Sequence, residues 1–338
     1  MRRLAFVVPG DIETRTGGSI YDTRIAGGLR ALGWCVDLVP TDLAAIPDAG
    51  IALVDGLALL ALDRDLERYA DRLRLVPLIH LPLALEVGLD AAEAARREAI
   101  ERRALAKARL VVATGRVTCE QLTQRGVERD RIALVEPGTD PAPIARGSRS
   151  DSVAIVAVGA LTPGKGHERL LRALATLPAA ARWTLTCAGS ADRDPRTAAR
   201  VRALVHDLGL GDRVAIAGEL GDEALAALYD RSDLFALATL RETYGMAVAE
   251  AIARGLPVVS TTVGAIPDIV GDGGLLVAPD ADEALAAALD RVIADAASRE
   301  QLAMGARASR MRLHTWDESS RAMAAALTGL DHDDRIAR

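Results

Sequence analysis

The sequence has few aromatic residues and few cysteines. Aromatic side chains make up only 3% of the 338 residues, so the cores must be built mainly from Ala, Leu and Val. The three cysteines, Cys35, Cys119 and Cys187, are odd in number, far apart and without histidines at metal-binding spacing. We therefore expect a reduced, cytoplasmic protein without a disulfide framework.

The sequence also lacks any long apolar run. No stretch approaches the roughly 18 uninterrupted apolar residues of a membrane span. The segment Leu4–Val8 follows two arginines, but it is shorter than the core of a secretory signal, about 7–15 residues, and no cleavage site follows it. A buried first strand explains it better. The net charge of −6 argues against nucleic acid as a partner.

Short apolar runs alternate with longer stretches of helical period along nearly the whole chain. This alternation is typical of parallel sheets covered by helices on both faces. The runs predict strands at Leu4–Val8, Cys35–Val39, Ile51–Val54, Leu75–Ile79, Leu110–Ala113, Ile132–Val135, Val153–Val158, Thr184–Cys187, Val214–Ala217, Leu234–Leu237, Pro257–Ser260 and Leu275–Val277.

A cluster of Pro, Gly and Ser between 137 and 150 interrupts this pattern and indicates an interdomain linker. We expect Rossmann-like domains at 1–145 and 151–315, and a C-terminal helix at 316–338 that packs back on the first domain. The predicted fold class is α/β, with two doubly wound domains facing each other across a cleft. Ligands of such sheets bind at the carboxyl ends of the strands.

Two glycine-rich loops follow predicted strands. Gly17 and Gly18 precede a helix, where free amides suit an anion, although a simple turn explains them equally well. The segment from Gly159 to Lys165 nearly spells a P-loop, but Gly166 replaces the hydroxyl residue that holds magnesium. A lysine at a helix start still suits a diphosphate; the alternative is a solvated lysine in a glycine loop.

A third loop carries two glutamates, Glu242 and Glu250, with seven residues between them. If Gly245 opens a helix, Glu242 lies in the loop before it and Glu250 lies inside the helix, so that both can touch one elongated ligand. Unrelated surface charges are the alternative. Glu250, however, stands in an otherwise apolar stretch, where a buried carboxylate needs a partner.

Taken in order, these segments resemble the retaining glycosyltransferases of the GT-B fold, specifically family 4 (group 1). The resemblance covers nearly the whole chain and includes the Gly17-Gly18 loop, the segment 107–114, the Gly-Lys-Gly loop, the paired glutamates and the run 255–270. It implies transfer of a hexose from a nucleoside-diphosphate sugar to an acceptor that the sequence does not identify.

The resemblance also implies roles for individual residues. Lys165 would hold the donor diphosphate above Gly17 or Gly18, Glu250 the ribose, and Glu242 the hexose. His80, after a predicted strand, is similar to the family's active-site histidine, so His80, Lys165 and Glu242 are the expected catalytic residues. The remaining donor-binding positions are Gly218, Glu219 and Leu220 near the base, and Tyr244, Gly245 and Met246 near the hexose.

One departure from the family pattern is Ala160, where members commonly carry an arginine. Arg15, Arg193 or Arg241 are candidates to replace it. Two Asp-Arg-Asp triplets, at 63–65 and 192–194, are similar to the motif of metal-dependent transferases of a different fold. A charged helix face explains the first triplet better, and an Asp-Pro turn explains the second. We expect no metal and no cofactor besides the sugar nucleotide.

Two other functions share these features: a sugar-nucleotide 2-epimerase, and a sugar-nucleotide-binding protein that has lost catalysis. The sequence leaves three classes of acceptor open: a sugar, a lipid-linked glycan and a small molecule. Contact with a membrane surface is also open, because the basic helix expected at 91–109 also carries glutamates at pairing distance, which favours a solvated helix.

Overall fold

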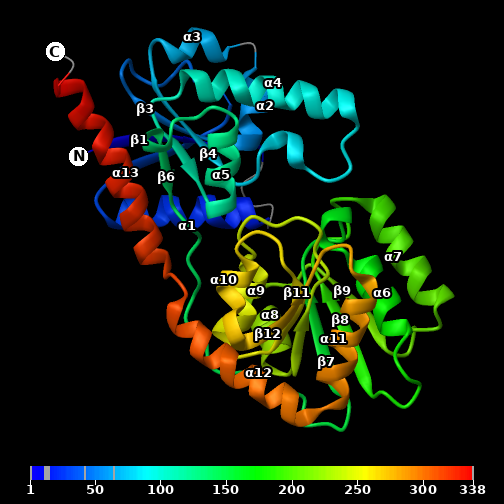
Figure 1. Ribbon diagram of the computed structural model, residues 1–338. Helices are drawn as coiled ribbons and strands as arrows, with labels where there is room; N and C mark the ends of the chain where they lie inside the picture. Colours follow the sequence, from blue (N-terminus) through cyan, green and yellow to red (C-terminus); the bar gives the residue numbers. More distant parts are fainter. Residues whose placement is uncertain (1, 11–15, 42, 64, 337–338) are drawn as a thin grey trace. The chain divides into compact units, whose positions relative to one another are not determined.

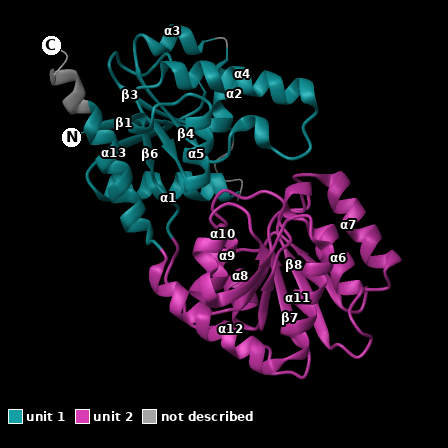
Figure 2. Ribbon diagram, viewed as in Figure 1, with its two compact units in different colours: residues 1–138, 314–338 teal, residues 139–313 magenta. Residues whose placement is uncertain are grey.

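The computed structural model describes residues 2–10, 16–41, 43–63 and 65–336, with side chains up to Leu330. The chain divides into two compact units, shown in two colours in Figure 2. Unit 1 contains residues 1–138 and 314–338, and unit 2 contains residues 139–313. Each unit is an α/β structure built on one parallel sheet (Figure 1).

The sheet of unit 1 has six strands in the order β2-β1-β3-β4-β5-β6, and every neighbouring pair is parallel. Its central strands are buried on both faces, as expected for a parallel sheet covered by helices. The strands are β1 (Arg3–Val7), β2 (Cys35–Val39), β3 (Ile51–Asp55), β4 (Arg74–Ile79), β5 (Val111–Ala113) and β6 (Ile132–Leu134).

Helices cover both faces of this sheet and enclose two hydrophobic cores. One core lies under α1 and α13, where Tyr21, Ile25 and Leu29 meet Met323 and Leu327. The other lies under the remaining helices. The helices of unit 1 are α1 (Gly17–Ala31), α2 (Leu59–Leu62), α3 (Leu66–Ala70), α4 (Ala91–Lys107), α5 (Arg116–Gln124) and α13 (Trp316–Ile336).

The sheet of unit 2 also has six parallel strands, in the order β12-β11-β10-β7-β8-β9. Counted from β7, this is the doubly wound Rossmann order. The strands are β7 (Val153–Val158), β8 (Trp183–Ala188), β9 (Val214–Gly218), β10 (Leu234–Ala236), β11 (Val258–Thr261) and β12 (Gly274–Val277).

A single hydrophobic core of mainly Ala, Leu, Val and Ile surrounds this second sheet, with Trp183, Tyr229, Phe235 and Tyr244 as its few aromatic members. The low aromatic content is therefore offset by close packing of small side chains. The helices of unit 2 are α6 (His167–Ala175), α7 (Pro195–Asp207), α8 (Asp222–Asp230), α9 (Met246–Ala253), α10 (Ile266–Val270), α11 (Asp282–Ala294) and α12 (Ala296–Ser309).

The structure confirms the predicted α/β class and all twelve predicted strands, with ends that differ by at most one residue. The segment 137–150, expected to be an interdomain linker, belongs mostly to unit 2. The chain passes between the units at Gly138 and Thr139, and the following residues belong to unit 2, where the N–H groups of Ala145 and Arg146 donate to the carbonyls of Arg254 and Asp230. The chain then returns to unit 1, where α13 packs along α1.

Several ion pairs lie along the basic helix α4. Glu93 pairs with Arg96 at 2.8 Å and with Arg97 at 2.7 Å, and Arg102 pairs with Glu98. Glu101 is one of the glutamates of this helix that were expected to be solvated. It is instead buried, and its Oε1 accepts the Leu83 N–H at 3.0 Å. Within the described residues, no helix is both long enough and apolar enough to cross a membrane.

The strand order defines one switch point in each sheet, where neighbouring strands send their following segments in opposite directions. In unit 2 it lies between β7 and β10, so the loops that carry Lys165 and Glu242 both start there. In unit 1 it lies between β1 and β3, beside the start of α1 and Asp55. The order of the strands thus selects these two places as ligand sites.

Gly166 is a sensitive position in the loop after β7. Its φ is +68°, and a Cβ there would lie 1.8 Å from the Ala238 carbonyl oxygen. Gly209 has nearly the same φ, +66°, but open space around it. We expect Gly209→Ala to cost about 1 kcal/mol through backbone strain alone, and Gly166→Ala to cost on the order of 3 kcal/mol because the clash adds to it. Chemical denaturation of both variants measures the difference, and equal losses would show that the loop absorbs the added methyl group.

Candidate functional site

The structure brings Lys165 and Glu242 together at the switch point of unit 2. Lys165 ends the short 3₁₀ segment η4 (Pro163–Lys165), and its Nζ donates to Glu242 Oε2 at 2.6 Å. The Lys165 side chain is 30% exposed and the Glu242 side chain 17%. The sequence placed these residues in one site but did not predict their ion pair. Because the lysine is accessible, it can exchange this carboxylate for another anion.

Hydrogen bonds between the two loops fix this geometry. The carbonyl of Gly164 accepts from the Leu240 N–H at 2.8 Å and from the Thr239 hydroxyl at 2.9 Å. A side chain at Gly159 would touch the methylene stem of Lys165 at 3.3 Å, so the stem lies directly over this glycine. The two loops therefore place the stem of the lysine over Gly159 and its ammonium group beside Glu242.

Glu250 lies on α9, which begins at Met246 after Gly245, whose φ is +104°. The Glu250 Oε2 is 3.1 Å from the Tyr229 hydroxyl. Burial raises the pKa of Glu250, and the charge of Arg254 and the Tyr229 hydrogen bond oppose that rise. The Arg254 guanidinium stacks 4.6 Å from the Tyr229 ring centroid, which ties the three side chains together. The predicted need for a partner is therefore met within the unit.

The other predicted donor residues of unit 2 occupy the same edge of the sheet. Tyr244 and Gly245 are buried between Glu242 and the start of α9, and Met246 is half-buried. The remaining three follow β9, where Gly218 ends the strand with φ +71°, Glu219 is exposed and Leu220 packs against the core.

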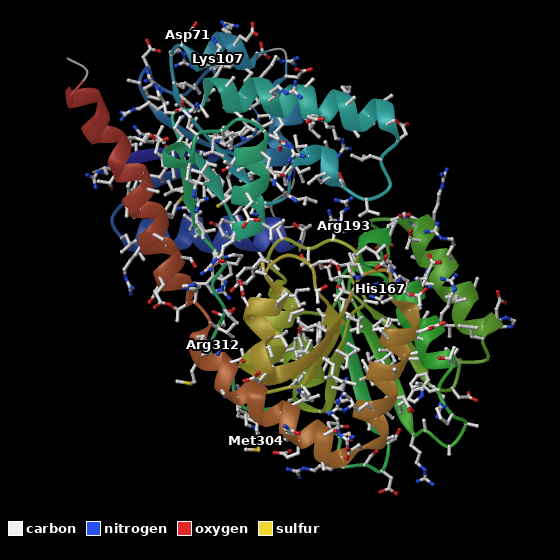
Figure 3. The ribbon with its side chains drawn as sticks, in the orientation of Figure 1. Asp71, Lys107, His167, Arg193, Met304 and Arg312 are labelled. Carbon is white, nitrogen blue, oxygen red and sulfur yellow. The ribbon has the colours of Figure 1, made fainter. Side chains whose placement is uncertain are left out.

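Ala160 lies in the same loop as Lys165 and is half-buried. Arg193 and Arg241, two candidates for the missing cation, are exposed on the loops after β8 and β10, and Figure 3 labels Arg193. The third candidate, Arg15, lies outside the described residues. Asp194 of the second Asp-Arg-Asp triplet caps α7 by accepting the Thr197 N–H at 3.0 Å, which gives this carboxylate a structural role.

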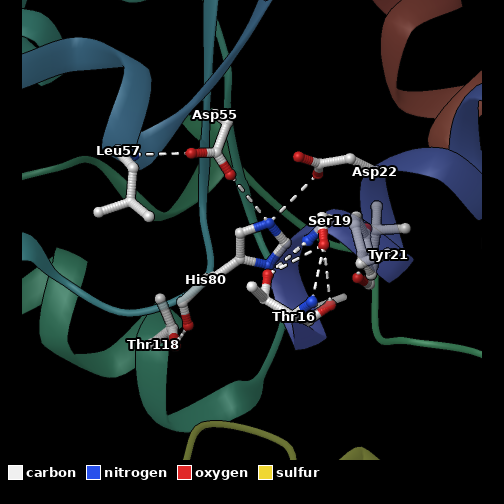
Figure 4. A network of polar contacts seen from close by, with 9 residues as sticks. Thr16, Ser19, Tyr21, Asp22, Asp55, Leu57, His80 and Thr118 are labelled. Carbon is white, nitrogen blue, oxygen red and sulfur yellow. Dashed lines mark hydrogen bonds and ion pairs between the residues drawn. The ribbon is translucent and has the colours of Figure 1, made fainter. Parts of the chain in front are cut away.

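The corresponding edge of unit 1 holds a cluster centred on His80, directly after β4 (Figure 4). The ring Nε2 lies 3.3 Å from Asp22 Oδ1 and 3.2 Å from Asp55 Oδ2. Asp22 comes from α1 and Asp55 from the end of β3, where its other oxygen accepts the Leu57 N–H at 2.7 Å. The ring of Tyr21 meets the His80 ring edge-on at 5.1 Å.

The two carboxylates control the charge of His80. Burial by itself lowers the pKa of the imidazole, but the hydrogen bonds and charges of Asp22 and Asp55 outweigh burial and raise this pKa to about 10. Burial raises the pKa of Asp22 to about 6, against the opposing effect of His80. At neutral pH the ring is an imidazolium between two acids.

The ligand atoms of His80, Asp22 and Asp55 all lie within 4.8 Å of one another, close enough to surround a cation. A ring N–H lies within hydrogen-bond distance of both carboxylates and would occupy the space between them. The expectation that no metal binds stays a prediction. The sequence identified His80 but missed both aspartates. The available signal was the position of Asp55 directly after a strand at the switch point.

The predicted glycines of unit 1 lie beside this cluster. Thr16 caps α1 by accepting the Ser19 N–H at 3.0 Å, and Gly17 and Gly18 form the first turn. A Cβ at Gly18 would lie 3.5 Å from Cδ2 of His80, an ordinary van der Waals distance, so the helix start lies directly beside the ring. Their predicted contact with the donor diphosphate stays a prediction.

His167 at the start of α6 is buried, and neither ring nitrogen has a partner within the described residues. Burial, together with the charge of Lys165, lowers its pKa to about 4. The folded protein thus resists a proton that the unfolded chain accepts below pH 6.5. Folding stability should therefore decrease as the pH falls from about 6.5 towards 4.

We expect this acid-side loss to be about 2–3 kcal/mol near pH 4.5 and to shrink in His167→Leu, which has no group to protonate. At pH 8 the variant should be at least as stable as the wild type, since no hydrogen bond is lost. Urea denaturation at the two pH values measures both effects. The same pH dependence of stability in wild type and in His167→Leu would show that His167 does not cause the acid-side loss.

Comparison with known proteins identifies the class of unit 2. Residues 142–309 match the model of the family described as "Glycosyl transferases group 1". This unit is therefore a glycosyl transferases group 1 domain, and the Lys165–Glu242 pair lies within it.

Among curated proteins, the chain is similar to D-inositol 3-phosphate glycosyltransferases. It is 33% identical to that of Xylanimonas cellulosilytica over 275 residues, which are 73% of this chain and 65% of the relative. It is 30% identical to that of Actinosynnema mirum over 277 residues, which are 74% of this chain and 66% of the relative. The similarity therefore spans slightly less than two thirds of these relatives.

Among solved structures, sucrose-phosphate synthase from Thermosynechococcus elongatus aligns with a TM-score of 0.81 and 22% identity, over 98% of this chain and all of that one. HepE of Anabaena, in complex with UDP and glucose, aligns with a TM-score of 0.78 and 18% identity, over 97% of this chain and all of that one. The fold of the chain is the GT-B fold of these glycosyltransferases.

Proposed function

We propose that this protein is a retaining glycosyltransferase of family 4 that moves a hexose from a nucleoside-diphosphate sugar to an acceptor. One observation carries the proposal: in a glycosyl transferases group 1 domain, Lys165 and Glu242 lie 2.6 Å apart at the switch point of the sheet. An accessible cation beside a carboxylate offers an anion site and a hydroxyl acceptor next to each other, which are the two ends of a sugar diphosphate.

The donor is bound along the carboxyl edge of the unit 2 sheet. Lys165 binds the diphosphate, and Glu242 with the amides of Tyr244, Gly245 and Met246 binds the hexose. Glu250, held by Tyr229 and Arg254, accepts hydrogen bonds from the ribose hydroxyls. The nucleoside base lies near Gly218, Glu219 and Leu220 at the end of β9. UDP-glucose is the first donor to test, because HepE was solved in complex with it.

Transfer breaks the bond between the anomeric carbon and the diphosphate oxygen. Negative charge then grows on the phosphate, and a lysine and amides already fixed in place stabilise it without reorganisation. The acceptor hydroxyl attacks from the face that the phosphate leaves, and the departing phosphate takes its proton, so the configuration is retained. Lys165 and the amides neutralise the leaving group, and we infer that no metal is required.

The proposed acceptor is a hydroxyl compound, and inositol phosphate is a reasonable first choice because the relatives are named for it. We propose that the protein works in the cytoplasm, with unit 1 serving the acceptor. A 2-epimerase would convert the sugar nucleotide without releasing nucleoside diphosphate, and a binding protein would leave it unchanged. Release of nucleoside diphosphate therefore identifies the transferase, and conversion of the sugar nucleotide without release separates the epimerase from the binding protein.

Lys165→Ala tests the diphosphate site. Wild-type protein with UDP-glucose and other sugar nucleotides should release nucleoside diphosphate in the presence of chelator, and the variant should lose about 10²–10³ in rate. Calorimetry should show weaker binding of the nucleoside diphosphate but unchanged binding of the nucleoside. Lys107→Ala, the same change on the exposed end of α4, is the matched control. Identical diphosphate titrations for wild type and Lys165→Ala would overturn the assignment, as would a rate lost in chelator and restored by magnesium.

The two glutamates should separate binding from turnover. Glu250→Gln should weaken the nucleoside diphosphate and the intact donor alike, by about 1–3 kcal/mol, and raise KM. Glu242→Gln should lower kcat with little effect on diphosphate affinity, because the hexose is positioned as its charge develops. Calorimetry and steady-state rates on variants of confirmed fold make the comparison. The same profile for both would show that their roles do not differ.

A further inference from the structure

The Nε2 atom of His80 contacts two carboxylates of unit 1. It lies 3.3 Å from Asp22 and 3.2 Å from Asp55, whose side chains are 2% and 3% exposed. Only the histidine, with 24% of its side chain exposed, reaches the surface. The two aspartates are therefore too deep to meet a ligand themselves, and any action they have passes through the ring.

The other ring nitrogen is placed differently. In the part of the chain that the structure describes, Nδ1 of His80 takes part in no hydrogen bond, and it is absent from the buried polar atoms without a partner. The two N–H bonds of an imidazolium point in nearly opposite directions. With Nε2–H directed at the buried carboxylates, Nδ1–H is therefore directed away from them and is the ring donor left for a ligand.

Neighbouring groups fix the ring and its charge. Besides the two aspartates, the Tyr21 ring packs against it, and burial raises the pKa of Tyr21, so this phenol stays neutral. The backbone is held as well, because the Thr118 hydroxyl donates to the His80 carbonyl at 3.5 Å. One imidazolium and two carboxylates leave the cluster with a net charge of −1, which favours a neutral hydroxyl over a phosphate at Nδ1.

We propose that Asp22 and Asp55 are positioning residues that keep His80 as a charged, oriented hydrogen-bond donor, and that its Nδ1–H binds a hydroxyl of the sugar donor or of the acceptor. The consequence for turnover rests on the proposed function, whereas the state of the ring does not. With both carboxylates present the ring holds its proton throughout the neutral range. With one of them neutralised, the proton leaves at a lower pH.

Nuclear magnetic resonance of ¹⁵N-histidine-labelled protein tests the ring directly. The sequence has five histidines, and His80→Gln assigns the signal. In wild type both ring nitrogens should stay protonated at pH 8. In Asp55→Asn, which retains an oxygen for the Leu57 N–H, the pKa of the ring should fall by at least one unit. Asp37→Asn, on the exposed edge strand β2, is the matched control.

Turnover gives the second measurement. Asp22→Asn and Asp55→Asn should lower kcat about ten- to a hundredfold, the usual effect of losing a hydrogen bond to a charged group. The loss should deepen as the pH rises, with unchanged affinity for the nucleoside diphosphate. If the hydroxyl belongs to the donor hexose, slow hydrolysis of the donor falls equally; if it belongs to the acceptor, only transfer falls.

A neutral His80 at pH 8 in wild type would overturn the proposal, whether or not the protein is a transferase. An Asp55→Asn variant with unchanged pKa and unchanged pH profile would do so too. If no donor is turned over but the ring behaves as described, the proposed function fails while the state of His80 stands.

Discussion

The carbonyl group of Gly164 is the contact on which the unit 2 site depends. It accepts the Leu240 N–H and the Thr239 hydroxyl, and so joins the loop after β7 to the loop after β10. The Thr261 hydroxyl in turn donates to the Thr239 carbonyl at 2.6 Å, which adds the end of β11. Three strand ends are thus joined by backbone groups that would otherwise lack partners at the sheet edge.

Because these bonds fix the loops before any ligand binds, the Lys165–Glu242 pair is preorganised. Gly166 permits this, since only glycine allows the chain to pass so close to the Ala238 carbonyl with a positive φ. Lys165 and Glu242, the side chains proposed to bind the donor, therefore stand on a frame held by its own hydrogen bonds. Such a frame is what electrostatic stabilisation of a leaving group requires.

The fold was largely predictable from sequence because a parallel strand buried on both faces produces a continuous apolar run. Even the three-residue strands β5 and β10 were visible in this way. The position of Lys165 and Glu242 in one site was implied by the family resemblance, and each residue stands in a loop after a predicted strand. The cluster around His80 was missed, since Asp22, Asp55 and His80 are far apart in sequence and meet only through strand order, and the position of Asp55 after a strand was too weak a signal by itself. Their type gave no warning, because aspartates after strands and in helices are usually solvated.

The two sites differ in how they hold charge. In unit 2 the cation and the carboxylate are both partly exposed, so water still screens them and exchange of partners costs little. In unit 1 two carboxylates are almost completely buried around one ring, and each depends on the ring for compensation. Removing one partner of a buried group leaves the others uncompensated, which is costly. The exposed pair of unit 2 suits a site where ligands bind and dissociate. The buried cluster of unit 1 suits a charge arrangement that stays the same.

The return of the chain to unit 1 has a consequence for synthesis on the ribosome. Met323, Leu327 and Leu330 of α13 complete the core that covers Tyr21, Ile25 and Leu29 of α1. These partners are separated by the whole of unit 2, so the apolar face of α1 emerges early and waits for its cover. Unit 2 is contiguous and has its own core, so it can fold first. The nascent first unit must therefore keep an open apolar face until α13 has left the ribosome, and this interval is when chaperones have a surface to bind.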